Sequence, residues 1–122
     1  MQEILKRHHI SFKNAFAGIW WAFGVHPNFR VHGLFALAAL GLSAYFRITH
    51  IEFIVVVFTI VLVFVAEMIN TSIESMTDLI TKEWRQEAKI AKDVSAGMTL
   101  VVAFGALVVG LVLFIPYIQL LF

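Results

Sequence analysis

Cysteine is missing from this chain and charged residues are scarce, and both shortages exclude whole classes of protein. Without cysteine, the chain forms no disulfide bonds and no thiolate metal sites. Charged residues make up 14% of the sequence and the formal net charge is +1, so the chain lacks the basic footprint of a nucleic-acid-binding protein. It also lacks the Gly-x-x-x-x-Gly-Lys-Ser/Thr motif and any glycine-rich nucleotide loop, which excludes the soluble classes built on them.

Hydrophobic residues, by contrast, dominate the sequence. They make up 61% of its 122 residues, and the mean hydropathy is +0.90, whereas a soluble domain is about 45–50% apolar. This composition predicts an all-α integral membrane protein that forms one small domain over residues 1–122. A bundle of this size has little interior of its own, so we expect it to form an oligomer.

Three apolar segments are candidates for transmembrane helices. The run in the middle segment, from Phe53 to Ala66, covers only about 21 Å at about 1.5 Å per residue, whereas the hydrocarbon core is about 30 Å thick. To complete this span, the helix must draw in polar residues before the run, such as Glu52, or after it, such as Glu67. The polar sequence after Ala66 therefore lies at or just inside the membrane boundary. We place the three helices at about residues 31–48, 52–80 and 94–121.

Lysine and arginine residues gather at one end of the predicted bundle. They precede the first span and fill the connector between the second and third spans, whereas the turn between the first two spans holds only Arg47. Because such residues favour the cytoplasmic side, we expect the N-terminus and the connector at residues 81–93 to be cytoplasmic. The basic residues are Lys6, Arg7, Lys13 and Arg30 before the first span, and Lys82, Arg85, Lys89 and Lys92 in the connector.

The first 25 residues predict an amphipathic helix over residues 1–25 that lies on the cytoplasmic surface of the membrane. A cleaved signal peptide is the alternative, but the aromatic residues around Trp20 make a poor lead-in to a cleavage site. Pro27 then breaks the chain before the first span. The apolar stripe of this helix consists of Ile4, His8, Phe12, Phe16, Ile19 and Phe23.

Four polar residues with helical spacing follow the middle apolar run: Glu67, Asn70, Glu74 and Asp78. They fall at about 0°, −60°, −20° and +20° around a helix, so one face carries three acids and an amide. Carboxylates at a membrane boundary are costly and rare without a function. This face suits a proton acceptor or Mg²⁺, which also keeps water and phosphate oxygens. In the purely structural alternative, Glu67 forms a hydrogen bond between helices and Asp78 is a solvated acid near a helix end.

Lys92 and Asp93 follow the basic connector, just before the third span. Lys92 either anchors the helix on the positive side of the membrane or holds polyphosphate oxygens, as lysine does in phosphoryl transfer. Asp93 either caps the N-terminus of the third helix or takes part in the functional site. Spacing alone leaves both pairs of alternatives open.

These polar blocks resemble those of a known family. Residues 67–78 (EMINTSIESMTD) closely resemble the signature of the bacterial integral-membrane diacylglycerol kinases, and residues 91–97 (AKDVSAG) are similar to the family's second block. Residues 27–32 (PNFRVH) resemble the entry to the first span in the branch typical of Gram-positive bacteria, which phosphorylates undecaprenol. The order of the blocks, the three spans and the length match the family as well.

The resemblance implies a homotrimer with active sites between subunits at the cytoplasmic face of the bacterial plasma membrane. It also implies that the cofactors are ATP and Mg²⁺. Glu67 would be the base that takes the proton from the lipid hydroxyl. Glu74 would be a direct Mg²⁺ ligand, and Asn70 would serve the metal–nucleotide site. Lys92 would contact ATP phosphates, and Asp93 would lie in the nucleotide-binding part.

One position departs from the family pattern. The family usually has a glutamate that completes the metal site immediately before the Pro-Asn-Phe-Arg block, and this sequence has His26 there. An imidazole is a poor ligand for Mg²⁺ and a better one for Mn²⁺, Zn²⁺ or other transition ions. Three readings follow: a metal site with fewer carboxylates and slow turnover, a different divalent ion that His26 helps to bind, or a loss of kinase activity.

The sequence thus predicts a multi-pass membrane enzyme that transfers phosphate from ATP to the hydroxyl of undecaprenol. A diacylglycerol kinase with the same mechanism is one alternative, because both alcohols present one hydroxyl at the same depth. A catalytically weakened or inactive nucleotide-binding relative is another, motivated by His26. An ion-conducting or efflux protein fits less well, because these acids gather at one edge of the membrane.

Overall fold

Helices make up all the regular structure in the part of the chain that is described. The computed structural model describes the backbone of residues 2–122 and the side chains of residues 11–122. Helices α2–α4 are each long and apolar enough to cross a membrane, so the all-α membrane fold predicted from the sequence is confirmed. The helices are α1 (Gln2–Val25), α2 (Pro27–Phe46), α3 (His50–Ile80) and α4 (Gln86–Gln119).

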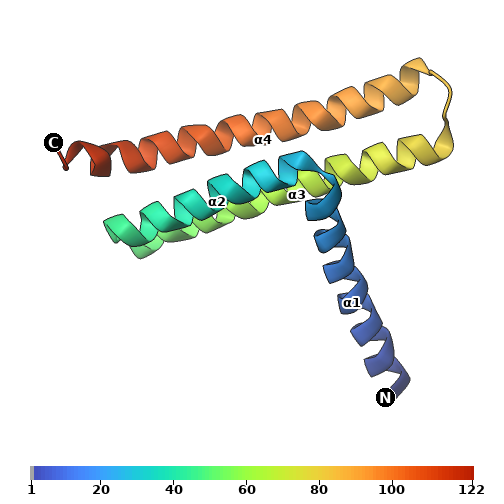
Figure 1. Ribbon diagram of the computed structural model, residues 1–122, viewed down its shortest axis with the longest axis horizontal. Helices are drawn as coiled ribbons and strands as arrows, with labels where there is room; N and C mark the ends of the chain where they lie inside the picture. The colour runs from blue at the N-terminus through green and yellow to red at the C-terminus, as the bar shows by residue number, and fades with distance from the viewer. Residues whose placement is uncertain (1) are drawn as a thin grey trace.

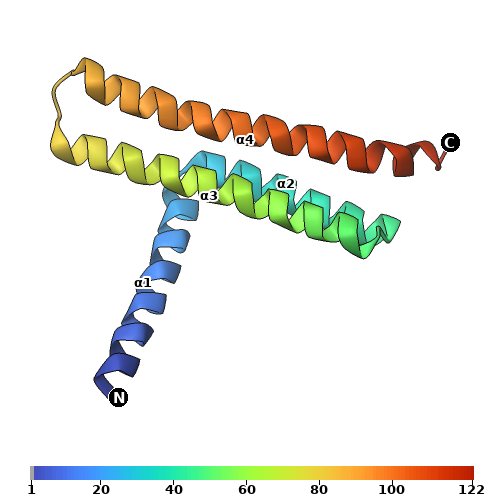
Figure 2. The same cartoon turned by 180° about the vertical axis from the view of Figure 1, so that it is seen from behind.

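Three of the helices run side by side, and the first leaves them steeply to one side (Figures 1 and 2). Helices α3 and α4 form the longest hairpin, and its closed end extends well beyond the corner where α1 meets α2 (Figure 1). The direction of α1, across the bundle, suits a helix that lies on the membrane surface. The side chains of Ile4 and His8, which begin the predicted apolar stripe, lie outside the described residues.

The α1–α2 corner is built by the chain break predicted at Pro27. His26 has an extended backbone (φ −98°, ψ 115°) and Pro27 follows at the start of α2, where its missing N–H costs nothing. The guanidinium group of Arg30 then reaches back to the end of α1. It donates to the carbonyl oxygens of Phe23 (3.1 Å) and Gly24 (2.9 Å), which satisfies backbone acceptors that a helix end leaves free.

Three aromatic rings pack together beside this corner. Phe23 of α1, Phe29 of α2 and Phe64 of α3 have ring centroids 5.3–5.8 Å apart, which is the spacing of favourable aromatic pairs. Phe29 is only 1% exposed. A Cβ atom at Gly33 would lie 3.3 Å from the Phe23 ring, so a glycine lets α1 approach α2 closely. This packing sets the position along α3 at which α1 makes contact, close to Phe64.

The opposite end of the bundle is tied by Glu52. Thr49 and Glu52 form a reciprocal cap at the start of α3, in which Glu52 Oε2 accepts from the Thr49 backbone N–H (2.8 Å) and hydroxyl (2.7 Å). The same oxygen accepts a 2.8 Å hydrogen bond from the hydroxyl of Tyr117 near the end of α4. One carboxylate therefore joins the α2–α3 turn to the last helix.

The start of the last helix differs from the sequence prediction. Helix α4 begins at Gln86, well before the predicted start at residue 94, so the connector is 81–85 instead of 81–93. Arg85 is the N-cap residue and Asp93 lies inside the helix, which rules out the alternative that Asp93 caps it. Hydropathy marks where a helix enters the membrane, whereas residues 86–93 are mostly good helix formers that extend α4 into water.

Little of the membrane-spanning surface is buried within one chain. In the 18-residue stretch of each helix that is apolar enough to span a membrane, the fraction buried within the chain is 11% for α2, 22% for α3 and 6% for α4. Lipid tails or other subunits must therefore cover most of this apolar surface. The homotrimer stays a prediction.

Candidate active site

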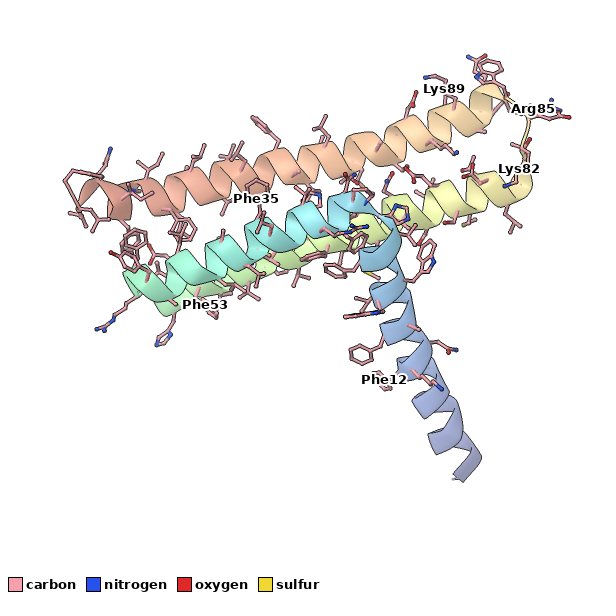
Figure 3. The ribbon with its side chains drawn as sticks, viewed as in Figure 1. Phe12, Phe35, Phe53, Lys82, Arg85 and Lys89 are labelled. Atoms are coloured by element: carbon pink, nitrogen blue, oxygen red, sulfur yellow. The ribbon has the colours of Figure 1, made fainter. Side chains whose placement is uncertain are left out.

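The predicted polar face lies on α3, which is a single helix from His50 to Ile80. Glu67 is 1% exposed and Asn70 is 7% exposed, whereas Glu74 is half-buried and Asp78 is exposed. The face thus runs from the dry interior beside the α1–α2 corner to the wet end of the hairpin. Figure 3 shows Lys82, Arg85 and Lys89 at that wet end, far from Phe53 at the other end of α3.

Glu67 holds an unsatisfied oxygen in the interior. Within the described part of the chain, Glu67 Oε2 is buried and has no hydrogen-bond partner. The nearest basic atom is Nε2 of His32 on α2, at 4.0 Å, which is beyond hydrogen-bond distance. A buried polar group without a partner is costly. The oxygen is therefore free to accept a proton or hydrogen bond from a bound molecule.

Asn70 lies in a network that joins α3 to α4. Its Oδ1 accepts a 2.7 Å hydrogen bond from the Ser95 hydroxyl, and its Nδ2 donates to Glu74 Oε1 at 3.1 Å. Ser95 is 3% exposed, and its single hydroxyl hydrogen is shared between Asn70 and the carbonyl oxygen of Lys92 (2.9 Å). The network orients the amide of Asn70 and one carboxylate oxygen of Glu74. It shows that these two predicted site residues lie together.

Lys92 and Asp93 both form ion pairs. The ammonium group of Lys92 contacts the carboxylate of Asp78 across the hairpin, and Lys89 contacts Asp93 one turn away along α4. The pair with Lys92 gives Asp78, whose role the sequence left open, a structural partner. It also places the positive charge of Lys92 beside the acidic face of α3.

His26 lies apart from the acids in the described contacts. Its ring packs edge-on against Trp21, with centroids 5.5 Å apart, and no hydrogen bond or ion pair joins it to Glu67 or Glu74 among the described side chains. Nor do three His, Asp or Glu side chains of residues 11–122 converge as a metal site. The roles of Glu74 and His26 in metal binding therefore stay predictions.

Sequence reasoning assigned no role to three residues that lie beside the site: His32, Thr71 and Ser95. His32 and Ser95 lie within the blocks at residues 27–32 and 91–97 that resemble the family. Thr71 Oγ1 is buried and, among described atoms, unpaired, whereas Thr59, Ser72 and Thr77 of the same helix bond to the carbonyl four residues back. A polar residue inside an otherwise apolar stretch is the signal that marks His32.

Comparison with known proteins identifies the family. The model of the prokaryotic diacylglycerol kinase family matches residues 13–114, which is most of the chain. This chain belongs to the prokaryotic diacylglycerol kinase family. The matched region contains all the candidate site residues, so the resemblance noted in the sequence is confirmed, and with it the class of membrane lipid kinase.

Two relatives of this diacylglycerol kinase family member carry different names. The chain is 36% identical over 108 residues to a diacylglycerol kinase of Synechocystis, a match that covers 88% of this chain and 62% of that protein. It is also 36% identical over 112 residues to an undecaprenol kinase of Bacillus subtilis, covering 92% of this chain and 91% of that protein. Both are named as kinases of a lipid alcohol, and the alcohols differ.

Proposed function

We propose that this protein is an ATP-dependent lipid kinase that phosphorylates the hydroxyl of undecaprenol at the cytoplasmic face of the membrane. The observation that carries the proposal is the buried carboxylate of Glu67, whose Oε2 is unpaired within the described chain. An alcohol is a poor nucleophile until an acceptor takes its proton. An unpaired carboxylate oxygen among apolar helices is such an acceptor.

The position of Glu67 along α3 supports a substrate that stays in the membrane. Glu67 follows Phe64 by about one helical turn, and Phe64 packs against Phe23 of α1. The base is therefore level with the corner at which α1 turns away from the bundle (Figure 1). With α1 on the membrane surface, Glu67 lies where hydrocarbon meets water. A long-tailed alcohol then keeps its tail in lipid while its hydroxyl reaches the base.

We assign the nucleotide to the wet part of the α3–α4 hairpin beyond Glu67. Lys92 points its ammonium group at Asp78 there, and an ammonium group has three donors, so Lys92 retains donors for phosphate oxygens. Asp93, which pairs with Lys89, lies in the same turn of α4. In this proposal, the γ-phosphate lies between these four side chains and the buried base.

The carboxylate oxygens of Glu74 fit Mg²⁺, which uses few protein ligands and keeps water and phosphate oxygens. When bound, Mg²⁺ neutralises charge on the transferring phosphoryl group. Glu74 would hold it, and the hydrogen bond that Asn70 donates to Glu74 keeps that carboxylate oriented. His26 has its ring against Trp21. We therefore favour a metal site with fewer carboxylates over one in which His26 is a ligand.

Three copies of the chain complete the site in this proposal. One chain buries little of its spanning surface, and its described side chains form no metal cluster of three His, Asp or Glu residues. In this proposal, a neighbouring subunit packs against α4, covers part of the exposed apolar surface and supplies further ligands to the metal. The proposed orientation puts the N-terminus and the hairpin tip in the cytoplasm, where ATP is available.

Diacylglycerol is the second candidate substrate, and the diacylglycerol kinase of Synechocystis is the observation that favours it. That relative is as similar in identity as the undecaprenol kinase of Bacillus subtilis. The Bacillus protein, however, matches along nearly its whole length. This end-to-end match, together with the PNFRVH block at residues 27–32, supports undecaprenol as the first choice.

A transfer assay tests the proposal. The full-length protein in lipid nanodiscs would be given radiolabelled ATP and Mg²⁺ with undecaprenol, with diacylglycerol or with no added alcohol. We expect labelled undecaprenyl phosphate to form faster than labelled phosphatidate. The reverse order would replace the substrate and keep the enzyme class. If nucleotide binds but no lipid is labelled with Mg²⁺, Mn²⁺ or Zn²⁺, the protein is a non-catalytic relative.

A further inference from the structure

The end of the bundle opposite the candidate active site contains a pocket between α3 and α4. The pocket has a volume of about 640 Å³, and its walls are built from Glu52, Tyr117 and the side chains of valine, leucine, isoleucine and proline residues. Glu52 precedes Glu67 by fifteen residues on the same helix, which is about 22 Å along the axis. With Glu67 at the cytoplasmic boundary, as proposed above, Glu52 lies towards the opposite boundary of a hydrocarbon core about 30 Å thick.

Glu52 has one carboxylate oxygen to spare in this pocket. Its Oε2 accepts hydrogen bonds from the backbone N–H and the hydroxyl of Thr49 and from the hydroxyl of Tyr117, whereas Oε1 accepts none in the described part of the chain. The bond from Tyr117 uses its single hydroxyl hydrogen. Neither polar side chain of the pocket therefore has a donor left to offer. An acid held at a membrane edge in this way is a candidate binding group.

Pro116 adds a second acceptor to the pocket. It lies inside α4 and has no N–H, so the carbonyl oxygen of Val112, four residues earlier, lacks the donor that a regular helix supplies. Both residues line the pocket. The ring of Tyr117 also lines it and packs against Phe46 of α2, with centroids 5.6 Å apart. Because an aromatic ring attracts a cation within about 6 Å of its centre, all three groups favour a positively charged donor.

We propose that this pocket binds a phospholipid whose headgroup carries a primary ammonium group. Such a group has one positive charge and three N–H donors, which the carboxylate of Glu52, the carbonyl of Val112 and the ring of Tyr117 receive. An acyl chain of the lipid covers the apolar wall between α3 and α4. The inference goes beyond the proposed kinase function and is independent of it, because this lipid takes no part in phosphoryl transfer.

The turn between α2 and α3 offers a contact for the phosphate of the same headgroup. This turn lies at the same end of the bundle as the last turns of α4 (Figure 1). It contains Arg47, which is exposed and ends α2. A guanidinium group forms strong, charge-assisted hydrogen bonds to phosphate oxygens. An ammonium group next to a phosphate therefore matches the charges at this end of the bundle, with Glu52 for the first and Arg47 for the second.

The distribution of charge favours this lipid over the other occupants. A lipid with a negatively charged headgroup and no cation would place like charges beside Glu52, and a quaternary ammonium group has no N–H to donate. A second copy of the chain is also a poor match. Helix α3 and the spanning part of α4 contain no lysine or arginine, so these helices bring no such cation to the carboxylate.

Photoaffinity labelling tests the inference. The full-length protein would be placed in phosphatidylcholine nanodiscs that contain a small fraction of a phospholipid with a photoactivatable diazirine in its acyl chain. Three probes share this chain and carry an ethanolamine, a choline or a glycerol headgroup. After irradiation, peptide mass spectrometry measures the labelling of residues 108–120. We expect the ethanolamine probe to label this segment about fivefold more than the choline probe and about tenfold more than the glycerol probe.

Removal of the charge of Glu52 tests the headgroup contact. Glu52→Gln keeps an oxygen that accepts from Thr49 and Tyr117, and we expect labelling by the ethanolamine probe to fall about tenfold, to the level of the glycerol probe. Glu87→Gln is the matched control, because Glu87 is an acid in the first turn of α4, at the other end of the bundle. This variant should keep the parental preference.

A pocket-filling variant tests the location without changing the acid, and it serves if Glu52→Gln does not fold. Val112→Phe should reduce the labelling of residues 108–120 by all three probes about threefold or more, because the larger side chain occupies the space of the acyl chain. Val101→Phe is the control. The two valines of α4 are equally exposed, at 73% and 72%, but Val101 does not line the pocket.

Three results would overturn the inference, and none of them depends on whether the protein transfers phosphate. Equal labelling by the three probes would show that the pocket takes hydrocarbon without selecting a headgroup. A preference for ethanolamine that survives Glu52→Gln would remove the role of the carboxylate. Labelling of other spanning segments but not of residues 108–120, in the parent protein, would show that a neighbouring subunit fills the pocket.

Discussion

Ser95 of α4 donates a 2.7 Å hydrogen bond to the side-chain oxygen of Asn70 of α3. Both residues are almost completely buried, at 3% and 7% exposure. Because the oxygen of the amide is taken, its nitrogen is directed at Glu74, 3.1 Å away. Ser95 thus orients the side chain of Asn70, and Asn70 in turn orients the carboxylate of Glu74, which we propose binds the metal.

Loss of the Ser95 hydroxyl should weaken the nucleotide site. In Ser95→Ala, Asn70 is left with an unsatisfied buried oxygen, so we expect kcat/KM for ATP to fall about three- to tenfold. Steady-state kinetics at saturating lipid measure this change. Ser72→Ala is a matched control, because the hydroxyl of Ser72 bonds only to the Met68 carbonyl of its own helix in the described contacts. Equal effects of the two substitutions would contradict the role given to Ser95.

Neutralising Glu67 should abolish most of the chemistry and spare nucleotide binding. Glu67→Gln keeps the shape of the side chain but removes the proton acceptor, and we expect kcat to fall by about 10²–10⁴-fold. Binding of an ATP analogue, followed by calorimetry, should change less than about twofold. Glu52→Gln removes a carboxylate from the opposite end of α3 and should leave kcat unchanged. A Glu67→Gln variant with the parental rate would remove the basis of the mechanism.

The ion pair between Lys92 and Asp78 predicts a coupled pair of effects on ATP binding. Lys92→Met should raise the dissociation constant for ATP about tenfold, because a charge-assisted contact to phosphate is lost. Asp78→Asn should raise it about threefold, because Lys92 is no longer held in place. The double variant should resemble Lys92→Met. Strict additivity of the two effects would show that Asp78 does not act through Lys92.

An exposed ion pair elsewhere in the chain provides the control for this comparison of the single and double variants. Arg85 and Glu83 lie 3.1 Å apart in the connector at the hairpin tip, and exposed pairs of this kind are worth about 0–1 kcal/mol. Glu83→Gln should therefore leave both the ATP affinity and the stability close to those of the parent.

The hydroxyl of Tyr117 should contribute to stability but not to catalysis. Tyr117→Phe removes the 2.8 Å hydrogen bond to Glu52, so we expect the free energy of unfolding to fall by about 1 kcal/mol. Thermal unfolding in nanodiscs measures this loss, and activity well below the Tm should be unchanged. Tyr45→Phe is the control, because Tyr45 is 69% exposed and packs on Phe46 through its ring.

Replacement of His26 by glutamate tests how the missing carboxylate affects the metal site. If the site works with fewer carboxylates, His26→Glu should increase the rate in Mg²⁺ several-fold and reduce any advantage of Mn²⁺. Rates in the two metals, compared for parent and variant, give the answer. A fast parent enzyme in Mg²⁺ that gains nothing from the change would show that His26 does not weaken the site.

The polar face of α3 could be predicted from the sequence because helical geometry alone determines it. Once residues 50–80 form one helix, Glu67, Asn70 and Glu74 must share a side. The pairing of Asn70 with Ser95 could not be predicted in this way. It depends on how α3 and α4 are aligned along their lengths, and no local spacing specifies that alignment.

The start of α4 and the surroundings of His32 show two further limits. Hydropathy follows the membrane, so it could not find the turns of α4 that precede the span, from Gln86 onward. The 4.0 Å approach of His32 to Glu67 arises from side chains of two helices brought together by the aromatic packing at the α1–α2 corner. Contacts of this kind, like the proposed trimer, are properties of tertiary structure.

The helix that spans the membrane as α3 also carries Glu67, Asn70 and Glu74, the residues proposed for the active site. Helix α3 runs without interruption from His50 to Ile80, and each residue of axial displacement moves Glu67 by about 1.5 Å. A bilayer that swells or shrinks shifts such a rod up or down to keep its oily section covered. The oxygen of Glu67, which we propose as the proton acceptor, would then rise or sink relative to the lipid headgroups, so we expect the turnover rate to depend on bilayer thickness.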